Sequence, residues 1–130
     1  MIMFRLVLIA MVVLTLAGCS KATKPNTGSA DIASLGDLTE FKKIAEDTLA
    51  IVEKKDMAGA KARIKDLETA WDNAEGAMRP KSETAWTAVD KAIDHALAAL
   101  RQDNSNPEDC AMKLKTVIVR MSPKLTAPSN

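Results

Sequence analysis

Hydrophobic residues recur at helical spacing through most of the chain between residues 34 and 123. The clearest series has steps that alternate between four and three residues after its first step, a spacing typical of helices that pack in a bundle. Its members are Met57, Ala60, Ile64, Leu67, Trp71, Ala74 and Met78. Asp56 can cap the start of this helix, and Gly76 with the segment 79–81 is expected to end it.

Three further amphipathic segments share this periodicity. The first is predicted to start at Asp37, which has the spacing of a capping box with Glu40. The second is expected after a capping Ser82, and a third after Asn106, where the next residue is a proline suited to the first helical position. Their apolar faces are Phe41, Ile44, Ala45, Thr48, Leu49, Ile51 and Val52; then Trp86, Val89, Ile93, Ala96, Leu97 and Leu100; then Cys110, Leu114, Val117, Ile118 and Met121.

Four amphipathic helices joined by short connections predict an all-α fold. We expect an antiparallel four-helix up-down-up-down bundle over residues 34–123, with residues 124–130 as a loose tail. Trp71 and Trp86 are the large side chains expected to fill its core. Residues 19–33 are mostly polar and predict a flexible tether before the bundle, because they offer little apolar surface to bury.

Residues 1–18 have the pattern of a secretory signal. Arg5 is followed by an apolar run from Leu6 to Leu16, broken only by Thr15, and then by small residues. The run is shorter than the ~20 apolar residues that a spanning helix needs. The alternatives are an uncleaved membrane anchor and an ordinary secretory signal with an incidental cysteine.

The stretch Leu16-Ala17-Gly18-Cys19 resembles the lipobox of bacterial lipoproteins. The resemblance implies cleavage before Cys19, a diacylglyceryl group on its thiol and acylation of the new amine. Two or more buried acyl chains anchor a protein stably to a membrane. Ser20 stands where aspartate would favour the inner membrane, which implies an outer-membrane lipoprotein that faces the periplasm.

Part of the remaining chain resembles a small group of uncharacterised all-helical bacterial envelope proteins. The matching pattern includes Asp66-Leu67-Glu68, Ala70-Trp71-Asp72 and, after Pro80 and Trp86, the segment 89–101. This group brings no known activity, so the resemblance implies an address in the cell envelope and no functional residue.

The charge balance argues against a nucleic-acid partner. Removal of Arg5 with the signal leaves 17 of the 18 basic residues against 17 acidic ones, whereas a nucleic-acid binder needs a basic footprint. Beyond the signal the aromatic residues are Phe41, Trp71 and Trp86, too few to stack along a single strand.

The residues that could carry chemistry are few. His95 is the sole histidine and lies opposite the apolar face of its helix, so it is expected to face solvent or a partner. Ala92 stands three residues before it, which excludes the Glu-x-x-His pairs of di-iron bundles. Cys110 lies on an apolar face and is interpreted as a small buried hydrophobe, with pairing between two molecules or a free thiol as the alternatives. We therefore expect no enzyme activity and no cofactor.

Five carboxylates offer the strongest candidate binding site. They are predicted to lie on one side of the second and third helices, with Asp72 level with Asp90, and Glu68 level with Asp94. The candidate ligands are Glu68, Asp72, Glu75, Asp90 and Asp94. Such oxygen clusters suit calcium or another cation. The alternative is neutralisation by the basic residues on the same flanks, which are Lys61, Lys65, Arg79 and Arg101.

Two functions follow from these patterns. The first is a lipid-anchored, non-catalytic interaction module that binds the membrane through Cys19 and another envelope protein through its bundle. The alternative is a periplasmic protein that binds a metal or a cationic ligand along the acidic flank.

Overall fold

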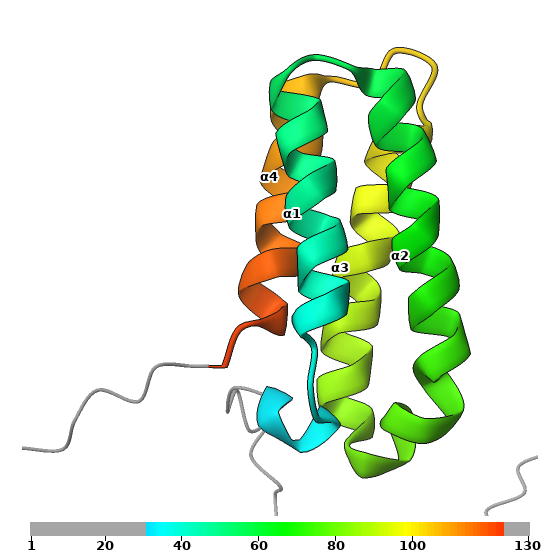
Figure 1. Cartoon of the computed structure of the whole chain (residues 1–130), viewed down its shortest axis with the longest axis vertical. Helices are drawn as coiled ribbons and strands as arrows, with labels where there is room; N and C mark the ends of the chain where they lie inside the picture. The colour runs from blue at the N-terminus through cyan, green and yellow to red at the C-terminus, as the bar shows by residue number, and fades with distance from the viewer. Residues whose placement is uncertain (1–30, 124–130) are drawn as a thin grey trace, which may run out of the picture.

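The computed structural model describes residues 31–123 and contains four α-helices. They are α1 (Thr39–Glu53), α2 (Met57–Met78), α3 (Glu83–Arg101) and α4 (Pro107–Met121). Two short 3₁₀ helices, η1 (Ile32–Leu35) and η2 (Arg79–Lys81), lie at one end of the bundle (Figure 1). The predicted all-α class is confirmed. The predicted signal segment 1–18, most of the tether 19–33 and the tail 124–130 lie outside the described residues.

Successive helices run in opposite directions along the bundle (Figure 1). Helix α4 packs against both α1 and α3, and α2 packs closely against α1. These contacts and directions agree with the expected up-down-up-down arrangement. In this arrangement α1, α2, α3 and α4 follow one another around the core, and each helix turns one side outward.

Three of the predicted helix caps are present. The Asp56 carboxylate accepts a hydrogen bond from the Gly59 N–H at 2.9 Å, and the Ser82 hydroxyl accepts one from the Ala85 N–H at 3.2 Å. The Asn106 amide oxygen accepts one from the Asp109 N–H at 3.0 Å. Each bond satisfies one of the N–H groups that the first turn of a helix leaves unpaired.

The start of α1 differs from the expectation. The helix begins at Thr39 with Leu38 at the N-cap, and the Asp37 carboxylate accepts a hydrogen bond from the Thr39 N–H at 2.9 Å. Leu38 is only 5% exposed. The burial of Leu38 fixes the chain just before the helix. Asp37 therefore accepts its hydrogen bond from the backbone N–H two residues onward, as Asp does in local turns. The Asp37–Glu40 capping box was therefore wrong.

Other predicted boundaries also shift. Gly76 lies within α2, which continues to Met78 before η2 ends it. The η1 helix begins at Ile32, inside the last residues assigned to the tether. Ile32 is half-buried against the core, so the folded part extends to the N-terminal side of Ala33.

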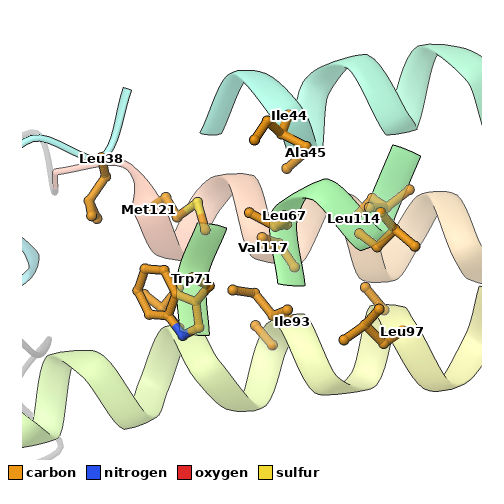
Figure 2. Packing of buried hydrophobic residues seen from close by; sticks show 14 of the residues in the cluster. Leu38, Ile44, Ala45, Leu67, Trp71, Ile93, Leu97, Leu114, Val117 and Met121 are labelled. Carbon is orange, nitrogen blue, oxygen red and sulfur yellow. The ribbon is translucent and has the colours of Figure 1, made fainter. Parts of the chain in front are cut away.

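The core consists of the inward faces of the four helices, with Leu35 and Leu38 packed at one end (Figure 2). In the series predicted for α2, five members are buried, and Met57 and Ala74 are half-buried. Trp71 and Trp86 stack with ring centroids 3.9 Å apart, and Phe41 meets Trp71 edge-on at 5.4 Å. The two indoles fill the space between α2 and α3, which are less closely apposed than the other neighbouring helices.

Candidate functional site

The five carboxylates of the predicted cation site lie on α2 and α3, but ion pairs occupy two of them. Glu68 pairs with Arg101 across α2 and α3, with Oε2 and Nη2 2.6 Å apart. Glu75 pairs with Arg79 at 2.7 Å, and Arg79 also reaches Glu83 at 3.1 Å. Two of the four basic residues named in the alternative interpretation therefore neutralise this flank.

The Asp90 carboxylate binds a side chain of the core. Its Oδ1 accepts a hydrogen bond from the Trp71 indole N–H at 3.1 Å. Asp72 and Asp94 are exposed. Within residues 31–123, no three His, Cys, Asp or Glu side chains converge into a group that could hold a metal ion. The five predicted ligands therefore do not form a ligand set in the described structure.

The two residues considered for chemistry lie as predicted. His95 is exposed on α3. Cys110 is fully buried, and its free thiol has a pKa raised by burial and by the nearby charge of Asp109. A raised pKa keeps the thiol protonated, which lowers its reactivity.

A charged cluster that the sequence did not reveal joins α1 to α2. Arg63 donates hydrogen bonds to Asp47 at 2.9 Å and to Asp66 at 2.7 Å, and Lys43 donates to Asp47 at 2.9 Å. Hydrogen bonds from Lys43 and Arg63 hold the pKa of Asp47 below its ordinary value. Every charge in this cluster is paired, so the cluster fixes helix packing and offers no open site.

The outward side of α4 has a different character. Met112 is 56% exposed and Val119 is 70% exposed, and they are the two large hydrophobic side chains that stand exposed among residues 31–123. They belong to a stripe of exposed residues that follows one side of the helix. We call this stripe the α4 face; its members are Glu108, Met112, Lys115, Thr116, Val119 and Arg120.

A groove of about 1120 Å³ runs beside the α4 face. Its other lining residues include Val52 and Glu53 at the end of α1, together with Ile32, Ala88 and Pro123. Lys115 reaches across to Glu53 with a separation of 3.9 Å. Ile32 and Pro123 stand at or next to the two ends of the described chain, so both of these ends lie beside the groove.

Sequence reasoning missed the α4 face. The predicted core series of this helix, from Cys110 to Met121, is confirmed except that Ile118 is half-buried. Met112 and Val119 fall outside that series and are seven residues apart, two turns on the same side of a helix. That regular spacing of two apolar residues on a polar side was the available signal.

Comparisons with models of protein families, with curated proteins and with solved structures found no match to this chain. The resemblance to bacterial lipoproteins and helical envelope proteins stays a prediction. In the part of the chain that the structure describes, each helix is too short or too polar to cross a bilayer.

Proposed function

We propose that this protein is a lipid-anchored, non-catalytic interaction module of the bacterial envelope, and that the α4 face is its contact surface. The exposure of Met112 and Val119 beside the groove carries this proposal. Aromatic residues and methionine are enriched at protein interfaces, and the fully buried part of such an interface is depleted in charge. Met112 is also flexible enough to adapt to an apolar partner surface.

Among the described residues, α4 alone carries large hydrophobic side chains that stand exposed. On α1 and α2, charged side chains pair with one another, as in the Arg63 cluster. On α3, Arg101 pairs with Glu68. Contact with a protein would bury two apolar side chains of α4 that now face water, and burial of apolar surface is the main favourable term in association.

The anchor is proposed from the sequence. Acylation of Cys19 would hold the bundle near a membrane, with the residues up to Asp31 as the connection. Ser20 favours the outer membrane and a bundle that faces the periplasm. Mass analysis of the protein from its own cell tests this part: an acylated N-terminal peptide beginning at Cys19 is expected, and an unmodified cysteine would contradict it.

The contact surface is tested by site-specific crosslinking in the cell. A photoreactive amino acid at Val119 of the full-length chain should capture a defined protein that mass spectrometry identifies. The same amino acid at His95, which is exposed on α3, is the matched control. Capture at His95 alone would show that α4 is not the contact surface, and equal capture of the same protein at both positions would show that contact is not specific to α4.

A further inference from the structure

We infer that the α4 face binds a second copy of this chain, with the two α4 helices packed side by side and antiparallel. The inference rests on the proposed function, because it names the partner of the same surface. It depends on three observations. Two concern α4, namely the spacing of its exposed residues and the separation of its charges, and the third is the length of chain that precedes the bundle.

The spacing fits a helix–helix seam. Glu108, Met112, Lys115 and Val119 are exposed and follow one another at steps of four, three and four residues. Alternating steps of this kind place side chains along one line of contact between two helices. Thr116 completes the middle of the line. The α4 face therefore has an apolar residue on either side of a polar centre.

A two-fold axis between Lys115 and Thr116 makes this surface complementary to itself. In that register Met112 of one copy lies level with Val119 of the other, and the reverse contact is identical, as a two-fold interface requires. Both large apolar side chains are then covered in both copies. The polar residues Lys115 and Thr116 meet at the axis.

The charges select the antiparallel direction. Glu108 and the half-buried Asp109 stand at the start of α4, and Arg120 stands in its last turn. In the antiparallel register, Arg120 of one copy lies about one helical turn from the level of Glu108 of the other, a step of ~5 Å along the axis. A parallel pair would place like charges and like ends of the helix dipoles together, which is unfavourable.

The surface is small for an interface. The 15 residues of α4 span only ~22 Å, and a standard interface buries ~800 Å² on each partner. The dimer is therefore expected to be weak in dilute solution. Anchoring of both copies to one membrane raises their effective concentration and favours association without any new contact.

The connection to the proposed anchor is long enough for both copies. Asp31 comes twelve residues after Cys19, and an extended chain of twelve residue steps reaches up to ~40 Å. The longest helix, α2, has 22 residues and spans ~33 Å. Two antiparallel bundles can therefore be attached to the same membrane, although their N-terminal connections start from opposite ends of the dimer.

Cysteine crosslinking in membranes tests the register. Two differently tagged full-length copies are produced together in their own cell, and the membranes are oxidised. Thr116→Cys lies next to the two-fold axis and should give a disulfide-linked dimer by itself. Met112→Cys in one copy should link to Val119→Cys in the other at least several-fold more than either variant links to itself.

Asn73→Cys, on the exposed side of α2, is the matched control. The parent chain gives the amount of disulfide-linked dimer that forms with the buried Cys110 alone.

Reversal of the charges gives an independent measurement. Glu108→Arg alone should reduce the Thr116→Cys dimer several-fold, and addition of Arg120→Glu in the same chain should restore it. Unchanged thermal melting of each variant shows that the bundle is intact. Failure of the double variant to restore the dimer would overturn the antiparallel register.

The outcomes separate this inference from the proposed function. Efficient linkage of Val119→Cys to itself would establish a parallel pair, and absence of any linked dimer would exclude a second copy. Capture of a different protein at Val119, with no dimer, would leave the proposed function standing and overturn the present inference. Absence of both the dimer and a captured protein would overturn the two together.

Discussion

The indole N–H of Trp71 donates a hydrogen bond to the Asp90 carboxylate at 3.1 Å, across the space between α2 and α3. Trp71 is only 1% exposed, so its N–H depends on this carboxylate for a partner. In the described residues, every buried side-chain nitrogen and oxygen has a hydrogen-bond partner. Asp90 therefore satisfies a buried donor of the core, although the sequence suggested that it would be a cation ligand.

Removal of the Asp90 carboxylate should destabilise the bundle. Asp90→Ala leaves the Trp71 N–H unpaired, and an unsatisfied buried donor costs about 1–3 kcal/mol. Asp90→Asn keeps an acceptor oxygen and should cost less. Urea unfolding followed by tryptophan fluorescence measures both changes, with Asp94→Ala on the exposed side of α3 as the control. Equal free energies of unfolding for all four proteins would mean that the bond contributes nothing.

The stacked indoles are expected to be the largest single contribution to the core. Trp71→Ala or Trp86→Ala removes a ring from the space between α2 and α3, and such truncations cost ~3–5 kcal/mol. The variants should melt at a much lower temperature than the parent, or fail to fold. A melting temperature equal to that of the parent for either variant would contradict the assigned packing.

The features that the sequence predicted are local ones. The start of α2 needs only Asp56 and the N–H three residues later, and its buried series needs only helical spacing. Both depend on residues within one or a few turns, so a single segment contains the required information. The cap at Asn106 and the core face of α4 were predictable for the same reason.

The acidic flank shows where local information ends. Helical spacing correctly placed Glu68 on the side of α2 that faces α3, but its partner Arg101 lies 33 residues away. Which cation meets which carboxylate depends on the rotation and separation of two helices, and these follow from packing of the large Trp71 and Trp86 rings. The sequence therefore indicated that acidic and basic side chains share one flank of α2 and α3, but it did not indicate which of them form ion pairs.

The α4 face was missed for a different reason. Exposed apolar residues are common on protein surfaces, so Met112 and Val119 were not informative in the sequence. Their significance depends on the side of α4 that α1 and α3 leave uncovered, and on the groove beside it. The η1 helix was missed because Ile32 and Leu35 form too short a series to show a period.

The cap of α4 gives a third prediction. Asn106→Ala removes the acceptor for the Asp109 N–H and should cost ~1 kcal/mol, the usual value for loss of an N-cap. Asn106→Asp keeps an oxygen acceptor and a favourable charge at the helix start, so it should be nearly neutral. Chemical denaturation measures both. An equal loss for the two variants would indicate that the cap is not the cause.

The buried thiol of Cys110 gives the last prediction. Burial and the charge of Asp109 raise its pKa above the ordinary value of 9.0. Since the thiol of the unfolded chain ionises at lower pH, the unfolded state binds fewer protons above that value, and stability falls as pH rises. Loss of stability through this group should begin near pH 9 and continue up to the raised pKa of the folded state.

Cys110→Ala isolates this effect. At pH 7 the variant should be less stable than the parent by ~1–2 kcal/mol, because it leaves a small cavity among buried side chains. The difference should shrink above pH 9, where only the parent loses stability by ionisation of residue 110. Urea denaturation at a series of pH values measures this difference. Both proteins keep Cys19, so the contribution of Cys19 cancels.

A thiol reagent should modify Cys110 slowly in the folded parent and rapidly in urea. Rapid labelling of the folded protein would show that the thiol is accessible, and a stability difference that does not change with pH would contradict the raised pKa.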